Sequence, residues 1–538
     1  MSLKPQPSRP MPEDLARIGA ILLPQDSPYR LIGDRLYALY DNAAFADLYH
    51  KEGKPALPAV DLLFVLALQA LEDLGDRAAA DAVRVRLDWK YALHLPLDAA
   101  GFDFSVLSDF RARLLVHDAS ARLFATLLSQ LRDLGLLKRR GRQRTDSLAV
   151  LARIHLLTRI ELVAETLRLA IRALLQADPT WAKATLPPAW EEWYGQRCVA
   201  ERLSEAERSR LQTETGRDGQ WLLDHLADPS TPTRLAMLPE VATLRTVWTQ
   251  QYELREAQVV FQDLRGYDGT VQIQSPHDAE ARWSKKGQKS WVGYKLQLTE
   301  TDDDDLPHLI TDIALSSSVE GDTSALVAIA DRQAARDVLP SERYVDQAYV
   351  SGGTLQASAA RGEDLIGPAP SSDPSPQARM ADGLTQAHFQ IDLEARLATC
   401  PAGATARGRV ATDGTIRFVF DTDRCGGCAL RPRCCTGKGG RRLTSSPGHA
   451  ALVAARERQE TEAFKTAYRA HRGGVEGGLS ALVRGQGMRV NRYIGQAKNH
   501  LRAVFVGAAV NLRRAARWLA GKRPQLRRHG LRLAEAGG

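Results

Sequence analysis

The sequence of 538 residues is poor in aromatic side chains, which make up 6% of it, and it has no long apolar run. Because no stretch of about eighteen apolar residues is present, the sequence predicts no membrane-spanning helix. Its first residues combine Pro, Ser and Lys without a sustained apolar segment, so we expect no secretory signal and a cytoplasmic location. The scarcity of aromatics beside abundant Ala, Leu and Arg favours helix.

Cysteine is also scarce, and the six residues are not spread as a disulfide framework would be. Cys198 stands alone, whereas the other five fall within 36 residues. In a cytosolic protein such clustering favours a metal site over disulfides. The clustered residues are Cys400, Cys425, Cys428, Cys434 and Cys435.

The spacing of these cysteines predicts a structural zinc site. Cys425 and Cys428 form a two-residue knuckle, and Cys400 in CPAG is a natural further ligand. Cys434 or Cys435 would supply the fourth thiolate of a closed tetrahedral Zn²⁺ site, and spacing does not decide between them. Such a site would hold together a small insertion with little core of its own. A loop that carries reduced thiols is the alternative interpretation.

Charge is present in quantity but is unevenly distributed. The chain is 44% hydrophobic and 25% charged, as in folded proteins, and its length suits two or three domains. Its net charge is +8, yet residues 469–538 hold 15 Lys and Arg against 2 Asp and Glu, a local balance of +13. This asymmetry favours a polyanionic partner, most simply nucleic acid. A solvated basic tail is the alternative.

Hydrophobic spacing predicts a helical N-terminal domain over residues 1–138. In PAVDLLFVLALQALEDLG the buried helix would end at Gly75, and Asp76 would cap the next helix. Two helices joined across a Gly–Asp turn are compatible with a DNA-binding helix-turn-helix, and a following helix offers Arg111 and Arg113 to DNA. A plain helical bundle with surface arginines is the alternative.

Residues 139–538 are predicted to form a mixed α/β domain with two insertions. The segment VGYKLQLTE alternates apolar and polar residues as a strand of a sheet does. A helical insertion is expected over residues 150–265 and a cysteine-rich one over residues 385–445. The chain would end in a basic helical segment.

Three acidic residues far apart in the chain carry the strongest chemical signal. Asp146 in QRTDSLAVL and Asp346 in RYVDQAYVSG follow runs that predict buried strands, and Glu476 lies in the helical stretch HRGGVEGGLSALV. Two aspartates at strand ends that face a glutamate on a helix would cage two hard cations such as Mg²⁺ or Mn²⁺. Two such ions about 4 Å apart clamp the attacking and leaving oxygens of a phosphodiester displacement. Taken singly, each acid is equally a turn, cap or surface residue.

Cationic residues surround Glu476 in the sequence. Arg472 precedes it by one helical turn, so the two would share a helix face. A cation-binding carboxylate beside phosphate-binding arginines suits phosphodiester chemistry. An ordinary surface ion pair between Arg472 and Glu476 is the alternative. The cations that follow are Arg484, Arg489, Arg492 and Lys498.

The chain resembles the DDE transposases of bacterial insertion sequences, which have a ribonuclease-H-like catalytic core. The resemblance covers nearly the whole chain and rests on FDFSVLSDFRARL, TDS at Asp146, SPHDAEARWSKKG, GYKLQLTET, VDQAYVS at Asp346, CPAG with the following cysteines, and GGVEGGLS through NRYIGQAKNHL. It implies that Asp146, Asp346 and Glu476 are the catalytic metal ligands. It also implies that Arg472 and the basic stretch after Glu476 contact DNA near the scissile phosphate.

Some positions depart from the related pattern. Many relatives place a tyrosine three residues before the arginine and a lysine seven after the glutamate, where this chain has Arg469 and Val483. Tyr468 and Arg484 each lie one position away. For the zinc site, the resemblance favours Cys434 as the fourth ligand.

The resemblance implies DNA transposition. The enzyme would bind the terminal inverted repeats of its element, cut the ends with two Mg²⁺ ions and join them to target DNA by in-line attack on phosphorus. Its partners would be double-stranded DNA and a second copy of the chain, since two ends are cut, and it would be found at the nucleoid when bound. The alternatives are a catalytically inactive, domesticated DNA-binding protein, a non-transposing metal-dependent nuclease and a zinc-stabilised regulatory module.

Overall fold

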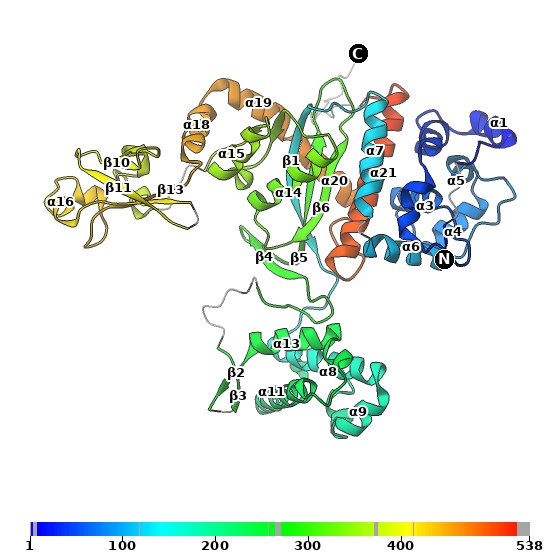
Figure 1. Cartoon of the computed structure of the whole chain (residues 1–538), viewed down its shortest axis with the longest axis horizontal. Coiled ribbons are helices and arrows are strands. Elements are labelled where there is room, and N and C mark those ends of the chain that lie inside the picture. The colour runs from blue at the N-terminus through cyan, green and yellow to red at the C-terminus, as the bar shows by residue number, and fades with distance from the viewer. Residues whose placement is uncertain are drawn as a thin grey trace, which may run out of the picture.

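The computed structural model describes residues 2–523 except 4–7, 118, 257, 264–268, 270, 371–374 and 413. A central mixed sheet flanked by helices joins a helical N-terminal region, a helical insertion and a small second sheet (Figure 1). The predicted α/β class with an all-helical N-terminal region is therefore confirmed. Residues 524–538 of the predicted basic C-terminus lie outside the described residues. In the part that is described, no helix is long and apolar enough to span a membrane.

The N-terminal region is built around one helix, α3, which is buried on nearly every side. A helix that is apolar all round belongs in the centre of a bundle, and the remaining helices and turns cover it. These elements are α1 (Glu13–Leu22), α2 (Pro28–Leu31), η1 (Ile32–Leu36), η2 (Tyr37–Leu39), η3 (Asn42–Leu48), α3 (Ala59–Glu72), α4 (Asp76–Val85), α5 (Leu87–Ala92), α6 (Ser105–Val116) and α7 (Ser120–Asp133).

The turn after α3 differs from the prediction. The helix ends at Glu72, before Gly75, because Asp73 takes a left-handed backbone conformation with φ of 53°. Asp76 does not cap α4: Gly75 occupies the cap position, and the Asp76 carboxylate accepts two hydrogen bonds from Arg111. The predicted cap is wrong because a guanidinium fork binds a carboxylate more strongly than a backbone N–H does.

The central sheet has six strands in the order β4–β5–β1–β7–β8, with β6 paired to β5. Strand β5 runs antiparallel to β1, β4 and β6, whereas β1, β7 and β8 run parallel to one another. This mixed, helix-flanked sheet is consistent with a ribonuclease-H-like core. The strands are β1 (Arg142–Leu151), β4 (Arg282–Lys286), β5 (Lys289–Thr301), β6 (Ile310–Ser317), β7 (Glu342–Tyr344) and β8 (Asp364–Ile366).

Successive side chains of β1 point to opposite faces of the sheet. Gln143 accepts a hydrogen bond from Gln333 of α14, which covers one face. The next residue, Arg144, lies against Gly474 of α20 on the other face. Asp146 has the same parity as Arg144 and therefore faces α20. The helices around the sheet are α14 (Asp322–Ala335), α15 (Gly352–Ala360), α18 (His449–Gln459), α19 (Glu462–Arg472), α20 (Gly474–Gln486) and α21 (Gln496–Leu519).

Helix α21 takes the place of a neighbouring strand at the edge of β6, which pairs only with β5 among the described strands. The Asn511 side chain accepts from the Ile310 N–H at 2.7 Å and donates to the Ile310 C=O at 2.8 Å. Near the other end of the strand, His500 Nδ1 accepts from the Leu315 N–H at 3.1 Å and Gln496 donates to the Leu315 C=O at 3.2 Å. Exposed strand edges invite pairing with other chains, and these contacts close this one.

One continuous hydrophobic core joins the N-terminal helices to the sheet. It contains buried residues of α3, α7, α20 and α21 together with those of β1, β5 and β6. Gly507 of α21 lets that helix approach closely, since an added Cβ would meet Ile313 of β6 at 2.8 Å and Phe124 of α7 at 3.3 Å. The core therefore crosses the position between residues 138 and 139 at which the sequence predicts a domain boundary.

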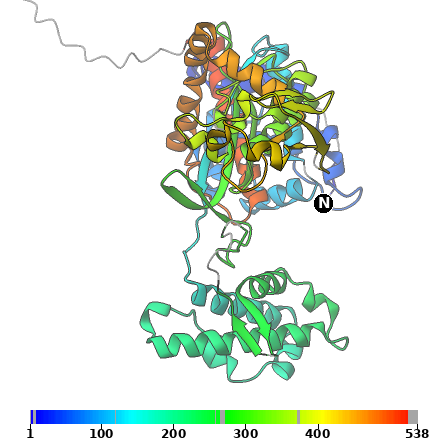
Figure 2. The ribbon, with the colours of Figure 1, turned by 90° about the vertical axis from the view of Figure 1, so that its left-hand side faces the viewer.

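The helical insertion stands apart from the sheet and has its own core, which includes Trp190 and Trp248 (Figures 1 and 2). It leaves the main body after β1 and returns before β4. Its elements are α8 (Arg159–Ala177), α9 (Pro179–Thr185), α10 (Trp190–Tyr194), η4 (Ala200–Arg202), α11 (Glu205–Ala227), α12 (Thr233–Ala236), α13 (Pro239–Gln251), β2 (Tyr252–Arg255) and β3 (Gln258–Phe261).

The small second sheet has five strands and lies at the opposite end of the molecule from the N-terminal helices (Figure 1). Its core is small and includes Phe418, Phe420 and Cys434. Its elements are β9 (Gln390–Asp392), β10 (Leu397–Thr399), β11 (Thr405–Val410), β12 (Ile416–Val419), α16 (Thr422–Gly426), α17 (Arg431–Cys434) and β13 (Arg442–Ser445).

Replacing Asn511 should test how strongly α21 seals the sheet. Asn511→Leu leaves the Ile310 N–H and C=O buried without partners, so we expect a loss of about 2–5 kcal/mol in the free energy of unfolding. Arg517→Leu, at an exposed position of the same helix, is the control and should change it little. Urea unfolding followed by circular dichroism measures both. Equal midpoints for the two variants would contradict the role given to Asn511.

Candidate active site

The register of two parallel strands brings two of the predicted acids together. Arg144 of β1 lies opposite Tyr344 of β7. The same offset, carried two residues further, places Asp146 level with Asp346 just past the end of β7. Since neighbouring strands lie about 4.8 Å apart, the two carboxylates come from adjacent backbone positions.

Asp146 is buried, and two groups hold its carboxylate. Oδ1 accepts from the Ser147 N–H at 2.7 Å, and Oδ2 lies 2.8 Å from Nη2 of Arg472 at the end of α19. Among the described residues, the ion-pair partner of Arg472 is thus Asp146 and not Glu476. The buried Nε–H of Arg472 has no hydrogen-bond partner in the same set of residues. The guanidinium therefore keeps one donor for an additional acceptor.

Asp346 is half-buried at the first turn after β7, where its carboxylate accepts from the Ala348 N–H at 2.9 Å. The pKa of Asp346 is raised, first by burial and then by the negative charge of Asp146. The positive charges of Lys286 and Arg472 oppose this rise. The two aspartates consequently lie within electrostatic reach of each other, and their repulsion is only partly neutralised.

A buried tyrosine, Tyr349, and a half-buried one, Tyr468, border the paired acids. The Tyr468 hydroxyl donates to the Val345 carbonyl at 3.1 Å, and the Tyr349 hydroxyl donates to Gln297. Burial raises the pKa of both phenols, and the charges of Asp146 and Asp346 raise it further. Sequence reasoning missed Tyr349, although VDQAYVS places it in the turn that follows Asp346. It noted Tyr468 only as lying one position from the pattern of relatives.

Glu476 occupies the first turn of α20 and is exposed. Gly473, between the two helices, keeps helical dihedral angles (φ −62°, ψ −27°), so Glu476 follows Arg472 by about one turn. Within the described residues, no three or more His, Cys, Asp or Glu side chains are arranged to hold a metal ion. The structure brings Asp146 and Asp346 together, and Glu476 does not join them in such a group.

Glycines in GGVEGG let α20 press onto the sheet. A Cβ added at Gly474 would meet the Arg144 guanidinium at 1.9 Å, and one at Gly478 would meet the Glu300 carboxylate at 2.9 Å. Gly477, one position earlier than Gly478, has nothing within 4 Å. Two of the glycines thus face the sheet, and their absence of side chains fixes how close the Glu476 segment lies.

A buried ion cluster forms the floor under this part of α20. Arg144 binds Glu300 at 2.7 Å and Asp302 at 2.6 Å. Arg514 of α21 also binds Glu300 at 2.7 Å, and His471 of α19 lies 2.8 Å from Asp302. Although burial raises the pKa of Glu300, the charges of Arg514 and Arg144 together lower it below the ordinary value. The cluster therefore connects α19, α21, β1 and β5 next to Asp146 and Asp346.

The paired aspartates fit a divalent cation. Carboxylate oxygens are the ligands that Mg²⁺ prefers, and a cation between Asp146 and Asp346 would remove the repulsion that raises the pKa of Asp346. Arg472 already neutralises part of the charge of Asp146. The exposed side chain of Glu476 would complete a three-carboxylate set by turning toward them.

The predicted DNA-binding cations have different surroundings. Arg484 and Lys498 are exposed, and Arg113 lies over the Tyr49 ring at 4.5 Å. The structure brings Arg111 and Arg492 into one pocket between the N-terminal helices and the start of α21. There Arg111 binds Asp76, and Arg492 binds Asp73 at 3.0 Å. Both guanidinium groups are therefore engaged within the protein. Arg111 and Arg492 would contact DNA only by releasing or sharing these acids.

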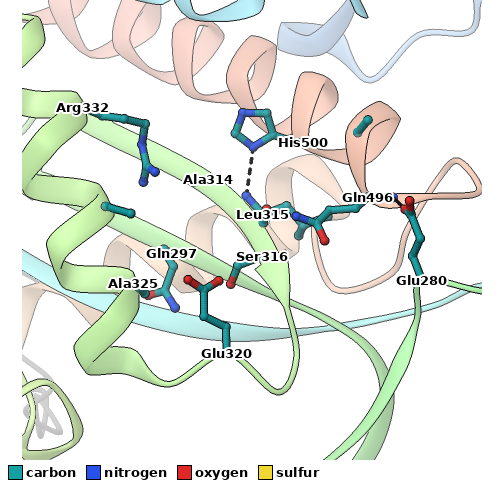
Figure 3. A pocket seen from close by; sticks show the side chains of 12 residues that line it. Glu280, Gln297, Ala314, Leu315, Ser316, Glu320, Ala325, Arg332, Gln496 and His500 are labelled. Carbon is teal, nitrogen blue, oxygen red and sulfur yellow. Dashed lines mark hydrogen bonds between the residues drawn. The ribbon is translucent and has the colours of Figure 1, made fainter. Parts of the chain in front are cut away.

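A cavity of about 550 Å³ lies at the β6 edge of the sheet, between α14 and the start of α21 (Figure 3). Its lining mixes carboxylates, a guanidinium and amides, and it includes none of the predicted catalytic acids. Gln297 belongs both to this lining and to the hydrogen bond with Tyr349. The polar lining residues are Glu280, Gln297, Ser316, Glu320, Arg332, Gln496 and His500.

The five clustered cysteines line one small pocket beside the second sheet. The Cys400 sulfur accepts from the Ala404 N–H at 3.3 Å. Burial, followed by the neighbouring Cys435, raises the pKa of Cys434 to about 12. Burial and Cys425 likewise raise the pKa of Cys435. The thiols share this pocket, yet no three of them are arranged to hold a metal ion among the described residues.

Two segments of the chain match models of transposase domains. Residues 399–516 match the model of a transposase DDE domain, and residues 20–113 match the model of a transposase domain known as DUF772. No curated protein and no solved structure matches the chain. Two segments of the chain are therefore similar to transposase domains, and the resemblance to insertion-sequence DDE transposases stated from the sequence is confirmed. The DDE match includes the cysteine cluster, Arg472 and Glu476.

Alanine substitutions in GGVEGG should separate the glycines that face the sheet from the one that does not. Gly478→Ala places a methyl group against the buried Glu300 carboxylate, so we expect a loss of about 1–3 kcal/mol in stability. Gly477→Ala meets nothing and should gain about 0.5–1 kcal/mol, because alanine favours helix. Thermal unfolding of the two variants measures the difference, and a stabilising Gly478→Ala would refute the close packing of α20.

Proposed function

We propose that this transposase binds the terminal inverted repeats of its element, cleaves the DNA there and joins the ends to target DNA. One observation carries the proposal: Asp146 and Asp346 are level on parallel strands, and Arg472 binds Asp146 at 2.8 Å. Paired carboxylates beside a guanidinium with an unpartnered N–H suit a phosphodiester, because they serve a cation and a phosphate oxygen together.

The three acids would bind metal ions, and Arg472 would bind the phosphate. Asp146 and Asp346, with Glu476 turned toward them, would hold Mg²⁺ or Mn²⁺. Such ions supply charge stabilisation at phosphorus and make bound water more acidic. Arg472 donates its free Nε–H to a phosphate oxygen while its Nη2 orients Asp146. Tyr468 and the ion cluster below α20 keep α19 in place, so that Arg472 meets the phosphate in a fixed direction.

DNA is the proposed partner on electrostatic grounds. The exposed Arg484 and Lys498 lie on the segment that follows Glu476, and they would contact phosphates near the cleaved bond. Two element ends are cut in transposition, so we propose that two copies of the chain act together. Both cleavage and joining are in-line attacks on phosphorus, so a single set of carboxylates would serve both reactions.

We also propose that the cysteine cluster binds a structural Zn²⁺ ion. Cys400, Cys425 and Cys428 would be ligands, with Cys434 as the fourth. All five clustered cysteines line one pocket, and the small core of the second sheet would give the ion a stabilising role.

Neutral isosteres of the three acids test the catalytic proposal. Asp146→Asn, Asp346→Asn and Glu476→Gln should each lower Mg²⁺-dependent cleavage of an element-end duplex by at least about 10³-fold, while end binding changes little. Cleavage is measured by gel electrophoresis and binding by fluorescence anisotropy. Asp304→Asn, at an exposed acid of the β5–β6 turn, is the matched control and should cleave normally.

The outcomes separate the proposed reaction from its alternatives. Full cleavage by any one isostere removes that residue from the metal-binding set. Cleavage without any strand-transfer product, in the presence of target DNA, identifies a nuclease. Binding of the ends with no cleavage by the unmodified protein identifies an inactive DNA-binding protein.

Metal analysis tests the zinc site. Cys425→Ser and Cys428→Ser should lose bound zinc, measured by inductively coupled plasma mass spectrometry, and should unfold at lower temperature because zinc binding contributes folding energy. Cys198→Ser should retain it, since Cys198 lies far along the chain in the helical insertion. If Cys435→Ser loses the metal and Cys434→Ser keeps it, the fourth ligand is Cys435. Equal zinc content in all variants would refute the site.

A further inference from the structure

The β4–β5 hairpin presents three lysines at its tip. Its strands are joined by the two-residue loop Gly287–Gln288, and Gly287 has φ of +62°, as the first loop residue of a type II′ turn requires. Lys285, Lys286 and Lys289 are all exposed. The hairpin continues β5, the strand that pairs with β1, so its tip is a rigid extension of the sheet that carries the acids.

The arrangement of these lysines is unfavourable for the protein alone. Lys286 lies directly opposite Lys289 in the antiparallel register, and like charges that face each other across strands are destabilising. Lys295, further along β5, is paired with Asp322 at 3.1 Å. By contrast, none of the three tip lysines forms an ion pair with any described residue. Their ammonium groups are therefore open to solvent and to an anionic ligand.

The hairpin projects past the carboxyl end of β1, the strand that carries Asp146 near its middle. Strand β5 is antiparallel to β1, so its first residues lie beyond the carboxyl end of β1, and β7 ends at the same side because it is parallel to β1. Lys286 is one of the positive charges that act on Asp346. Figure 1 shows the hairpin at the lower end of the sheet, on the side of the helical insertion.

From this placement we propose that Lys285, Lys286 and Lys289 hold the sugar–phosphate backbone of DNA beside the cleavage site. The inference rests on the proposed function, because it takes Asp146 and Asp346 to mark where the cut is made. Ammonium groups at the tip of a two-stranded ribbon suit phosphate oxygens, and phosphate contacts carry no sequence information directly. The hairpin therefore strengthens DNA binding and orients the DNA backbone, but it does not select a DNA sequence.

Salt dependence of binding gives a direct test. The probe is a fluorescein-labelled linear DNA duplex of random sequence, and affinity is measured by anisotropy over a series of KCl concentrations. Each phosphate contact contributes about 0.9 to the slope of log affinity against log salt. The triple variant K285Q/K286Q/K289Q should therefore have a slope smaller by about 2–3. K285R/K286R/K289R, which keeps the charges, should retain the slope of the unmodified protein.

A second triple variant provides the matched control. K51Q/K54Q/K183Q removes three exposed lysines elsewhere and lowers the net charge equally, so its slope should not change. The hairpin variant should unfold at the same temperature as the unmodified protein or higher, since it relieves the repulsion between Lys286 and Lys289. An equal loss of slope in both glutamine variants would reveal a general charge effect and overturn the inference.

The hairpin and the proposed function fail in different ways. If the unmodified protein cleaves element ends while the hairpin variant keeps its full salt slope, the hairpin inference is wrong and the function stands. If the unmodified protein shows neither salt-dependent DNA binding nor cleavage, both are wrong. A smaller slope together with cleavage that is restored by lowering the KCl concentration supports both.

Discussion

The buried ion pair between Arg472 and Asp146 is the contact on which the candidate site depends. It joins the last residue of α19 to the middle of β1, and so connects the segment carrying Glu476 to the strand carrying the first acid. Breaking such a pair leaves an uncompensated buried charge, which is costly. The ion cluster under α20 and the glycines above it then set the distance between helix and sheet. These contacts hold α19, α20 and β1 in position before any DNA binds beside Asp346.

Much of this frame could be predicted from the sequence, because local patterns determine it. The apolar run SLAVL after Asp146 and the segment RYV before Asp346 predict strands, and β1 and β7 lie there. Asp346 follows its strand as expected, whereas Asp146, also expected at a strand end, lies in the middle of β1. The convergence of the cysteines follows in part from the two-residue spacing of Cys425 and Cys428. These signals depend on few residues, so tertiary packing does not override them.

Other features could not be predicted because distant partners decide them. Asp76 has the sequence context of a helix cap, yet Arg111 binds it from another helix. The orientation of Glu476 depends on the backbone angles at Gly473 and on the packing of α20 against the sheet. The hydrophobic periodicity of the sequence predicts neither of these. The electrostatic influence of Lys286 on Asp346 depends on how far a twisted ribbon projects beyond its sheet.

The closure of β6 by α21 has a consequence for biosynthesis. His500 meets Leu315 across 185 residues of chain, so the ribosome completes the strand long before its covering helix emerges. At translation rates of about 5–20 residues per second, this delay is roughly 10–40 s. Throughout that interval the nascent polypeptide displays an open row of amide and carbonyl groups, which is a template for aggregation. Premature termination before Gln496 would make this exposure permanent, so truncated products should be substrates for chaperones and proteases rather than competitors of the full-length protein.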